Sequence, residues 1–143
     1  MTVLLLVLSA GCGGKTETAE VSEAAASVDV DLTKLSSTMV YSEVYNMMST
    51  PESYVGKIVK AKGPLSVYHD EKNDNYFFAV LINDATACCS QGLEFVWEGN
   101  HSYPDGYPQV GTEIVVTGTF CDYMDGEQQY YHLDNASLVL AQA

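Results

Sequence analysis

The sequence predicts a mostly β domain with one short N-terminal helix, closed into a small five-stranded Greek-key barrel. Apolar and polar residues alternate with period two in several segments between residues 57 and 133, as in half-buried strands. Gly63-Pro64 interrupts the first of these segments and indicates a bulge or a sharp bend. Asp125-Gly126 is a strong hairpin signal and joins the last two segments.

The helix is expected near the start of the folded part. Ser42 suits an N-cap, and Val44, Met47 and Met48 follow on one helical face. Thr50-Pro51-Glu52 then repeats a helix start, with proline in the first helical position and an acid in the first turn. We interpret the methionine face as core packing.

Five strands are expected after this helix. Their ranges are 57–68, 76–82, 93–97, 112–123 and 128–133, followed by a last apolar piece at 138–140. The second is almost wholly apolar, which predicts a strand that is covered on both sides or crosses a closed core. Residues 98–109 are rich in Gly, Pro and Tyr and are expected to form an ordered loop.

This order of strands fits an OB-fold, a five-stranded Greek-key barrel. Residues 51–63 and 111–120 resemble the first and fourth strands of small bacterial OB domains of the tRNA-anticodon-binding-like type. Such domains occur on many exported proteins that bind no tRNA. Residues 84–95, which contain adjacent cysteines, resemble the vicinal-cysteine soluble domain of a permease-associated family of unknown function. That family is loosely linked to metal handling.

The first residues resemble the export and lipidation signal of a bacterial lipoprotein. An apolar run and small residues in 1–11 precede Cys12. In lipoproteins the chain is cut before this cysteine, which then carries a diacylglyceryl group. Residues 12–38 lack aromatic side chains and predict a disordered tether, and residues 39–143 form the expected domain. The expected location is the extracytoplasmic side of the cell membrane, where the lipid anchors the chain.

Charge excludes one class of partner. The net charge is −13, and residues 41–143 contain fourteen acidic side chains, four lysines and no arginine. Because nucleic-acid binding depends on neutralising phosphates with Lys and Arg, no nucleic-acid partner is expected. Small ligands, cations and envelope proteins remain, so the expected function is that of a binding or accessory module.

Three cysteines of the domain leave several alternatives open. Cys88 or Cys89 could form a disulfide with Cys121, or all three could remain thiols packed as small hydrophobic groups. A thiolate metal site for Zn²⁺ or Cu⁺ is a third alternative, with His101 or His132 completing the ligand shell. A thiol-redox enzyme is disfavoured because the sequence has no Cys-x-x-Cys motif and no basic residue beside the pair.

Aromatic side chains are the other candidates for ligand contact. Ten tyrosines and Trp97 allow either cross-strand packing or a stacking platform of the kind that binds sugars or single strands. The candidates for a ligand face are Tyr76, Trp97, Tyr103, Tyr107 and Tyr130. Loops 69–75 and 122–127, where OB-folds bind ligands, are acidic and suit either Ca²⁺ or plain solvation. No catalytic triad, carboxylate pair or phosphate loop stands out, so no enzymatic activity is expected.

Overall fold

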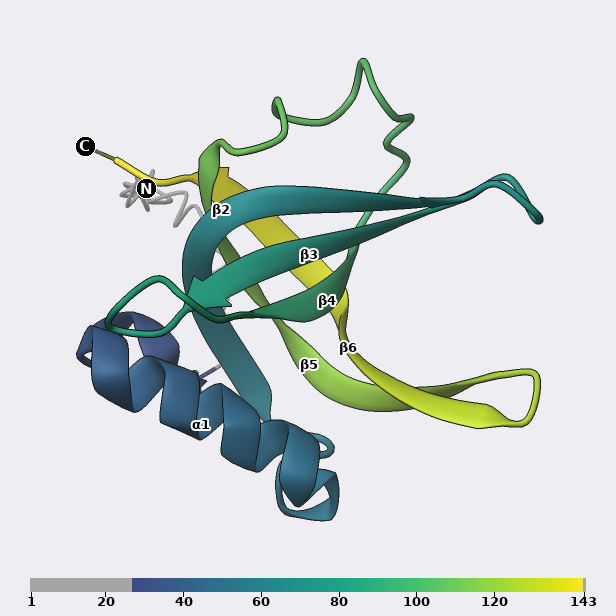
Figure 1. Ribbon diagram of the computed structural model, residues 1–143. Coiled ribbons are helices and arrows are strands. Elements are labelled where there is room, and N and C mark those ends of the chain that lie inside the picture. Colours follow the sequence, from purple (N-terminus) through teal and green to yellow (C-terminus); the bar gives the residue numbers. More distant parts are fainter. Residues whose placement is uncertain (1–26, 143) are drawn as a thin grey trace, which may run out of the picture.

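The computed structural model describes residues 27–142, and Cys12 with the predicted signal lies outside them (Figure 1). The helical elements are α1 (Ser37–Ser49) and two 3-10 turns, η1 (Leu32–Lys34) and η2 (Pro51–Ser53). The strands are β1 (Val30–Asp31), β2 (Ile58–Asp70), β3 (Asn75–Asn83), β4 (Ser90–Trp97), β5 (Glu113–Asp125) and β6 (Gln128–Leu140). The predicted mostly β fold with one N-terminal helix is confirmed. Within the described range, no helix combines the length and apolar character needed to cross a bilayer.

The strands form one mixed sheet that curls into a ring (Figure 1). Their order is β1-β2-β3-β4-β6-β5, and an additional pairing between β2 and β5 closes the ring. The pairing between β4 and β6 is parallel, whereas β2–β3, β3–β4, β5–β6 and β2–β5 are antiparallel. β1 adds a short parallel edge to β2.

Gly63 marks the point where β2 changes its partner. Residues 58–64 pair with β5, and residues 65–70 pair with β3. A Cβ on Gly63 would lie 2.1 Å from the carbonyl oxygen of Leu81 on β3, so the close approach requires glycine. The sharp bend predicted from Gly63-Pro64 is confirmed, and it gives β2 the curvature seen in Figure 1.

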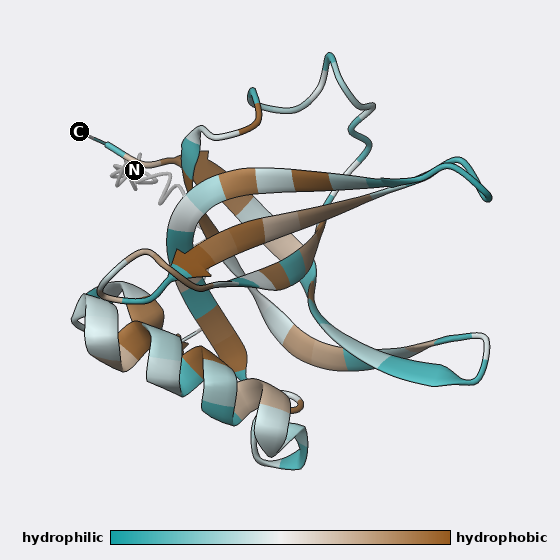
Figure 2. Cartoon of the chain, in the orientation of Figure 1, coloured by the Kyte–Doolittle hydropathy of each residue, from teal (hydrophilic) through white to brown (hydrophobic). Residues whose placement is uncertain are grey.

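The core fills the ring and the space between the ring and α1. Figure 2 shows the hydrophobic residues of the strands along the ring, while the tips of the two long hairpins are hydrophilic. Val59, Ala61 and Leu65 alternate as buried residues on β2, as the period-two pattern predicts. On β3 only Val80 and Ile82 are fully buried. Of the two predicted alternatives, a strand covered on both sides is therefore wrong, because Phe77, Ala79 and Leu81 on its other face are only partly buried.

Helix α1 begins before the predicted position. Ser36 is its N-cap and its hydroxyl accepts a hydrogen bond from the first turn, whereas Ser42 lies inside the helix. Val44 and Met47 are fully buried, so the expected packing face is confirmed. The second helix start produces only the 3-10 turn η2.

Part of the expected tether packs on the domain. Val30 and Asp31 pair with β2, and Leu32 is only 2% exposed. Asp29 holds the same edge, because its carboxylate accepts a hydrogen bond from the main-chain amide of Ile58 at 2.8 Å. Ordered structure therefore precedes the expected boundary at residue 39, because the buried Leu32 and the partly buried Val30 and Leu35 pack against the core.

Strand β6 continues through the expected gap between residues 133 and 138. The β5–β6 pairing shifts register between Thr117 and Thr119. Asn135, which lies opposite this shift, has a positive φ of 46°. Asp134-Asn135 is a typical turn pair in sequence, but here it is accommodated by a bulge that bends the strand without ending it.

Candidate functional site

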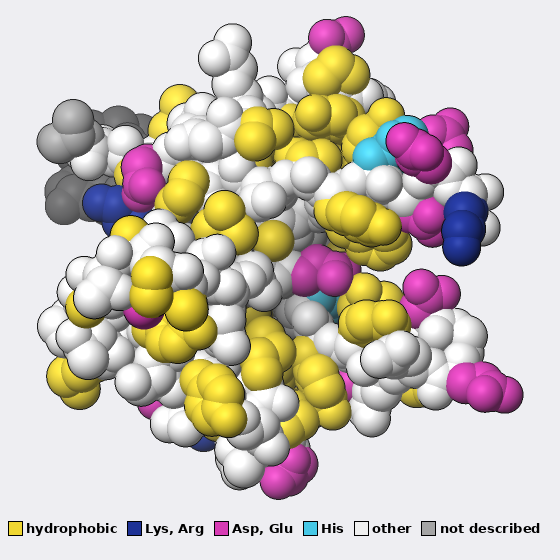
Figure 3. Space-filling model, viewed as in Figure 1, with side chains coloured by type: hydrophobic (Ala, Val, Ile, Leu, Met, Phe, Trp, Pro, Cys, Tyr) yellow, Lys and Arg dark blue, Asp and Glu magenta, His cyan; other side chains and the backbone are white. Residues whose placement is uncertain are grey.

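A groove with a volume of about 520 Å³ opens between the β2–β3 hairpin and the β5–β6 hairpin. In Figure 3 hydrophobic side chains lie on both sides of this opening, and acidic side chains gather around the tips of the two hairpins. The aromatic residues of the groove are Tyr68, Phe77, Phe78, Tyr123 and Tyr130.

Each hairpin contributes a cross-strand aromatic pair to the groove. Tyr68 lies opposite Phe77 with ring centroids 6.3 Å apart, and Tyr123 lies opposite Tyr130 at 5.6 Å. Directly opposed aromatic residues stabilise an antiparallel pair. The same four rings therefore stiffen the two hairpins and form the walls between them.

Glu94 lies on the floor and connects the two walls. It is on β4, opposite Ala79, on the face turned away from the buried residues Leu93 and Phe95. The Tyr123 hydroxyl donates a hydrogen bond to Glu94 Oε2 at 2.9 Å. In the sheet β6 lies between β4 and β5, so this side-chain bond links two strands that are not paired with each other.

His132 completes this group from β6. Its Nδ1 lies 3.7 Å from Glu94 Oε1, and its ring stacks on Tyr123 with centroids 4.7 Å apart. Burial raises the pKa of Glu94 above its ordinary value, and the contacts with Tyr123 and His132 oppose this only in part. Burial also raises the pKa of Tyr123, followed by its bond to Glu94. Tyr123 therefore remains a hydrogen-bond donor over the whole physiological range.

The raised pKa of Glu94 predicts a dependence of stability on pH. As pH falls from 7 toward the ordinary value of 4.5, the folded chain takes up this proton before the unfolded chain does. The free energy of unfolding of the wild type, compared with that of Glu94→Gln, should therefore increase as pH falls and decrease as pH rises through the raised pKa.

Chemical unfolding of both proteins at several pH values measures this difference. Asp70 and Asp84, whose pKa values are lowered by hydrogen bonds, contribute equally to both proteins and cancel. Placing His132→Asn in both backgrounds removes the neighbouring imidazole, so that the two proteins compared differ only in the carboxyl group. If the difference in the free energy of unfolding stays constant from pH 7 to about 4.5, burial does not raise the pKa of Glu94.

A second hollow of about 410 Å³ adjoins the groove and shares Phe77, Phe78, Glu94 and Tyr123 with it. Three of the predicted ligand-face residues line it: Tyr76, Trp97 and Tyr107. Tyr130 lines the main groove, and Tyr103 lines neither hollow but packs beside Tyr76 at 4.8 Å between ring centroids.

These aromatic residues also hold the loop between β4 and β5. The Tyr107 ring stacks on Phe78 at 4.0 Å, and His101 stacks on Trp97 at 3.5 Å. The loop is ordered, as expected, because its rings pack against the β3–β4 surface. Two of the predicted ligand-face residues, Trp97 and Tyr107, therefore have one ring face covered by another side chain. Tyr68, which was not predicted from the sequence, is 67% exposed in the groove.

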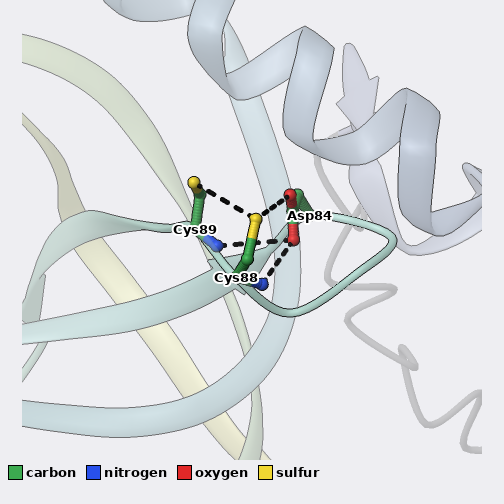
Figure 4. A group of neighbouring side chains, drawn as sticks. All are labelled: Asp84, Cys88 and Cys89. Atoms are coloured by element: carbon green, nitrogen blue, oxygen red, sulfur yellow. Dashed lines mark hydrogen bonds between the residues drawn. The ribbon is translucent and has the colours of Figure 1, made fainter.

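The second group of chemically active side chains is the thiol corner, which consists of Asp84, Cys88 and Cys89 at the β3–β4 turn (Figure 4). The Sγ atoms of the two cysteines lie 3.5 Å apart. Cys88 Sγ donates to Asp84 Oδ2 at 3.2 Å. One ligand atom from each of the three residues lies within 4.8 Å of the others.

The turn itself brings these groups together. Asp84 Oδ1 accepts a hydrogen bond from the main-chain amide of Cys88 at 3.0 Å, and the Asp84 amide donates to the Cys89 carbonyl at 2.9 Å. Ala87 adopts a positive φ of 55°, which is uncommon for a residue with a side chain. Adjacent side chains point to opposite faces in an extended strand, so this turn is what allows both sulfurs to point the same way.

The protonation of the corner follows from its contacts. The hydrogen bond from the Cys88 thiol is the main cause that lowers the pKa of Asp84, so the carboxylate is ionised at neutral pH. The Cys89 pKa is raised, first by its hydrogen bond with Cys88 and then by charge repulsion from the same neighbour.

The predicted five-residue metal set is only partly assembled. Within residues 27–142, Asp84, Cys88 and Cys89 are the one group of three potential metal ligands that lie close together. Cys121 lies opposite His132 on the β5–β6 pair, and burial raises its pKa. His132 faces Glu94 and His101 faces Trp97. Asp84 is not among the metal ligands predicted from the sequence, although an aspartate that begins a turn is a recognisable signal.

The remaining cysteine and loop alternatives are also resolved in the described part of the chain. Cys88, Cys89 and Cys121 are free thiols, so the disulfide to Cys121 is not formed. Cys88 and Cys89 are exposed and do not act as packed hydrophobic groups. In the acidic loop after β2, Asp70 accepts hydrogen bonds from its own turn and Asp74 pairs with His69. These carboxylates cap turns and form no cluster that suits Ca²⁺.

Comparison with known proteins finds no matching family model, no similar curated protein and no similar solved structure. The groove and the thiol corner are therefore the features from which a function can be inferred.

Proposed function

We propose that the chain is a lipid-anchored, extracytoplasmic binding module built on an OB-fold, and that its groove binds a neutral oligosaccharide. OB-folds bind oligosaccharides and oligonucleotides on the face of their second and third strands, between the first–second and fourth–fifth loops. Here the corresponding elements are β3 and β4, with the β2–β3 and β5–β6 hairpins on either side. The groove lies between those hairpins.

The observation that carries this proposal is the combination of aromatic walls with a carboxylate floor. Flat apolar rings can contact the apolar faces of sugar rings, and carboxylates accept hydrogen bonds from sugar hydroxyls. The charged groups of the groove are Asp70, Glu94, Asp125 and a single Lys72. This negative balance disfavours phosphate-bearing ligands, which need Lys and Arg.

The cellular setting of the proposal comes from the first residues of the chain. Lipidation at Cys12 would place the groove outside the cytoplasmic membrane, where glycans are abundant. Two acyl chains hold a protein stably in a membrane, because each buried methylene contributes about 0.8 kcal/mol. An envelope protein that inserts a segment into the groove is the alternative ligand.

Titration of the unacylated full chain, Cys12→Ser, with defined oligosaccharides tests the function. The probes are β-1,4-linked N-acetylglucosamine and glucose oligomers, followed by ¹H–¹⁵N NMR and calorimetry. We expect the amides around Phe77, Glu94 and Tyr123 to shift. Tyr68→Ala and Tyr130→Ala should each weaken binding about fivefold or more, because each removes one stacking ring.

Tyr45→Ala is the matched control, since Tyr45 is also an exposed tyrosine (58%) but lies on α1, away from the groove. It should leave binding unchanged. If no oligosaccharide shifts the groove, and Tyr68→Ala instead abolishes capture of a membrane protein, the envelope-protein alternative replaces the oligosaccharide.

A further inference from the structure

We propose that the thiol corner is a Zn²⁺ site formed by Cys88, Cys89 and Asp84, separate from the groove and independent of the function proposed for it. Cysteine is usually among the most buried residue types, yet both cysteines of the corner are exposed. Packing therefore does not explain two adjacent thiols at this turn. Their convergence on one carboxylate gives the chemical reason instead.

The spacing of the ligand atoms matches a tetrahedral zinc ion. With Zn–S bonds of about 2.3 Å and a Zn–O bond of about 2.0 Å, two sulfurs lie about 3.8 Å apart and sulfur and oxygen about 3.5 Å apart. The corner has 3.5 Å between its sulfurs and 3.2 Å between Cys88 Sγ and Asp84 Oδ2. These two pairs would need to open by only a few tenths of an ångström. Cys89 Sγ lies within 4.8 Å of the Asp84 carboxylate, and a movement of the Cys89 side chain would bring it to the ion.

The turn holds the carboxylate ready for this role. Asp84 Oδ1 accepts main-chain hydrogen bonds from Cys88 and Cys89, at 3.0 and 3.4 Å. Its other oxygen, Oδ2, faces the Cys88 thiol and the Thr86 hydroxyl. One oxygen thus fixes the turn while the other is available to the metal, so binding needs little reorganisation.

The donor set selects the metal and the type of site. Thiolates prefer Zn²⁺ or Cu⁺ over Mg²⁺ and Ca²⁺, and the carboxylate oxygen favours Zn²⁺ over the softer Cu⁺. No fourth protein ligand joins the group among the described residues. Sites with three protein ligands keep an open coordination position, unlike closed structural sites. We therefore infer that the ion is exchangeable, that both thiols bind as thiolates, and that their protons pass to solvent.

Zinc titration of the full chain tests this inference. All proteins carry Cys12→Ser, are fully reduced and are handled without oxygen, and Zn²⁺ is competed against a chromophoric chelator. We expect one Zn²⁺ per chain. Cys88→Ser and Cys89→Ser should each weaken binding by more than the roughly 10–100-fold that the loss of an outer-sphere partner produces. Co²⁺ should give sulfur-to-metal charge-transfer absorption that both variants reduce.

Two further variants separate metal ligation from the structure of the turn. Asp84→Asn retains a side-chain oxygen that can accept the hydrogen bonds of the turn but loses the charge, so we expect binding to weaken while the thermal midpoint changes little. Cys121→Ser is the matched thiol control and should bind Zn²⁺ as the parent does. The proposal is overturned if the reduced parent binds no Zn²⁺, if binding survives the Cys88→Ser, Cys89→Ser double substitution, or if Cys121→Ser abolishes it. Because the groove residues are unchanged in these variants, failure here leaves the oligosaccharide proposal untouched.

Discussion

Gly63→Ala is expected to destabilise the protein by about 3 kcal/mol, a large part of the 5–15 kcal/mol typical of a small domain. The added Cβ would lie 2.1 Å from the carbonyl oxygen of Leu81 and 3.1 Å from Val80 Cγ1. The closest atom belongs to the backbone of β3, so no side-chain rotation relieves the contact. Relief requires β2 and β3 to separate where β2 passes from β5 to β3.

Urea unfolding followed by circular dichroism measures this loss. Gly92→Ala is the matched control, because its Cβ would meet Ala79 Cβ at 3.4 Å, an ordinary contact. Both substitutions replace a strand glycine and have similar effects on the unfolded chain. We expect Gly92→Ala to change the free energy of unfolding by less than about 1 kcal/mol. Equal midpoints for the two variants would mean that the close approach at Gly63 is not needed to close the ring.

Phe120→Ala should cost about 3–5 kcal/mol, because it removes a fully buried aromatic side chain and leaves a cavity. The Phe120 ring stacks on Tyr131 at 5.5 Å and meets Tyr54 edge-on at 6.4 Å. Its main chain bonds to both Gly56 and Lys57, so the residue lies where the segment after η2 enters β2. The cavity would therefore weaken the packing among β5, β6 and the segment from residue 54 to residue 57.

The same unfolding experiment on Phe77→Ala provides the comparison. Phe77 is only partly buried and lies in the wall of the groove, so its truncation should cost clearly less than that of Phe120. Phe120→Leu should lie between the wild type and Phe120→Ala, since it fills part of the cavity. A smaller loss for Phe120→Ala than for Phe77→Ala would contradict the position of Phe120 in the core.

The core strands were predictable because their signal is local. Val59, Ala61 and Leu65 alternate with polar residues, and the alternation alone indicates which face of β2 is buried. The turn at Gly126 was also predictable, because Asp125-Gly126 is a local hairpin signal. In the structure Asp125 pairs with Gln128 across this turn. The start of α1 was misplaced by several residues because two serines, Ser36 and Ser42, are equally suitable caps in sequence.

The candidate sites were predictable only in part. Adjacent cysteines are visible in any sequence, so Cys88 and Cys89 were identified as possible ligands. Asp84 was not, because its role depends on a turn in which Ala87 adopts a positive φ. The histidines were expected beside the thiols because neutral imidazole is a common ligand. The closed ring of strands instead places His132 against Glu94, and His101 packs on Trp97.

The amino-acid sequence by itself determined the strand segments, the bend in the first long strand, the negative charge and the presence of an adjacent thiol pair. These depend on neighbours within a few residues or on composition alone. The tertiary structure decided which side chains meet. The Tyr123–Glu94 bond joins strands that are not paired, and the groove lies between two hairpins that are far apart in the sequence. Such contacts arise only when the ring closes, because the distance between its members is set by the curvature of the whole sheet and not by local sequence.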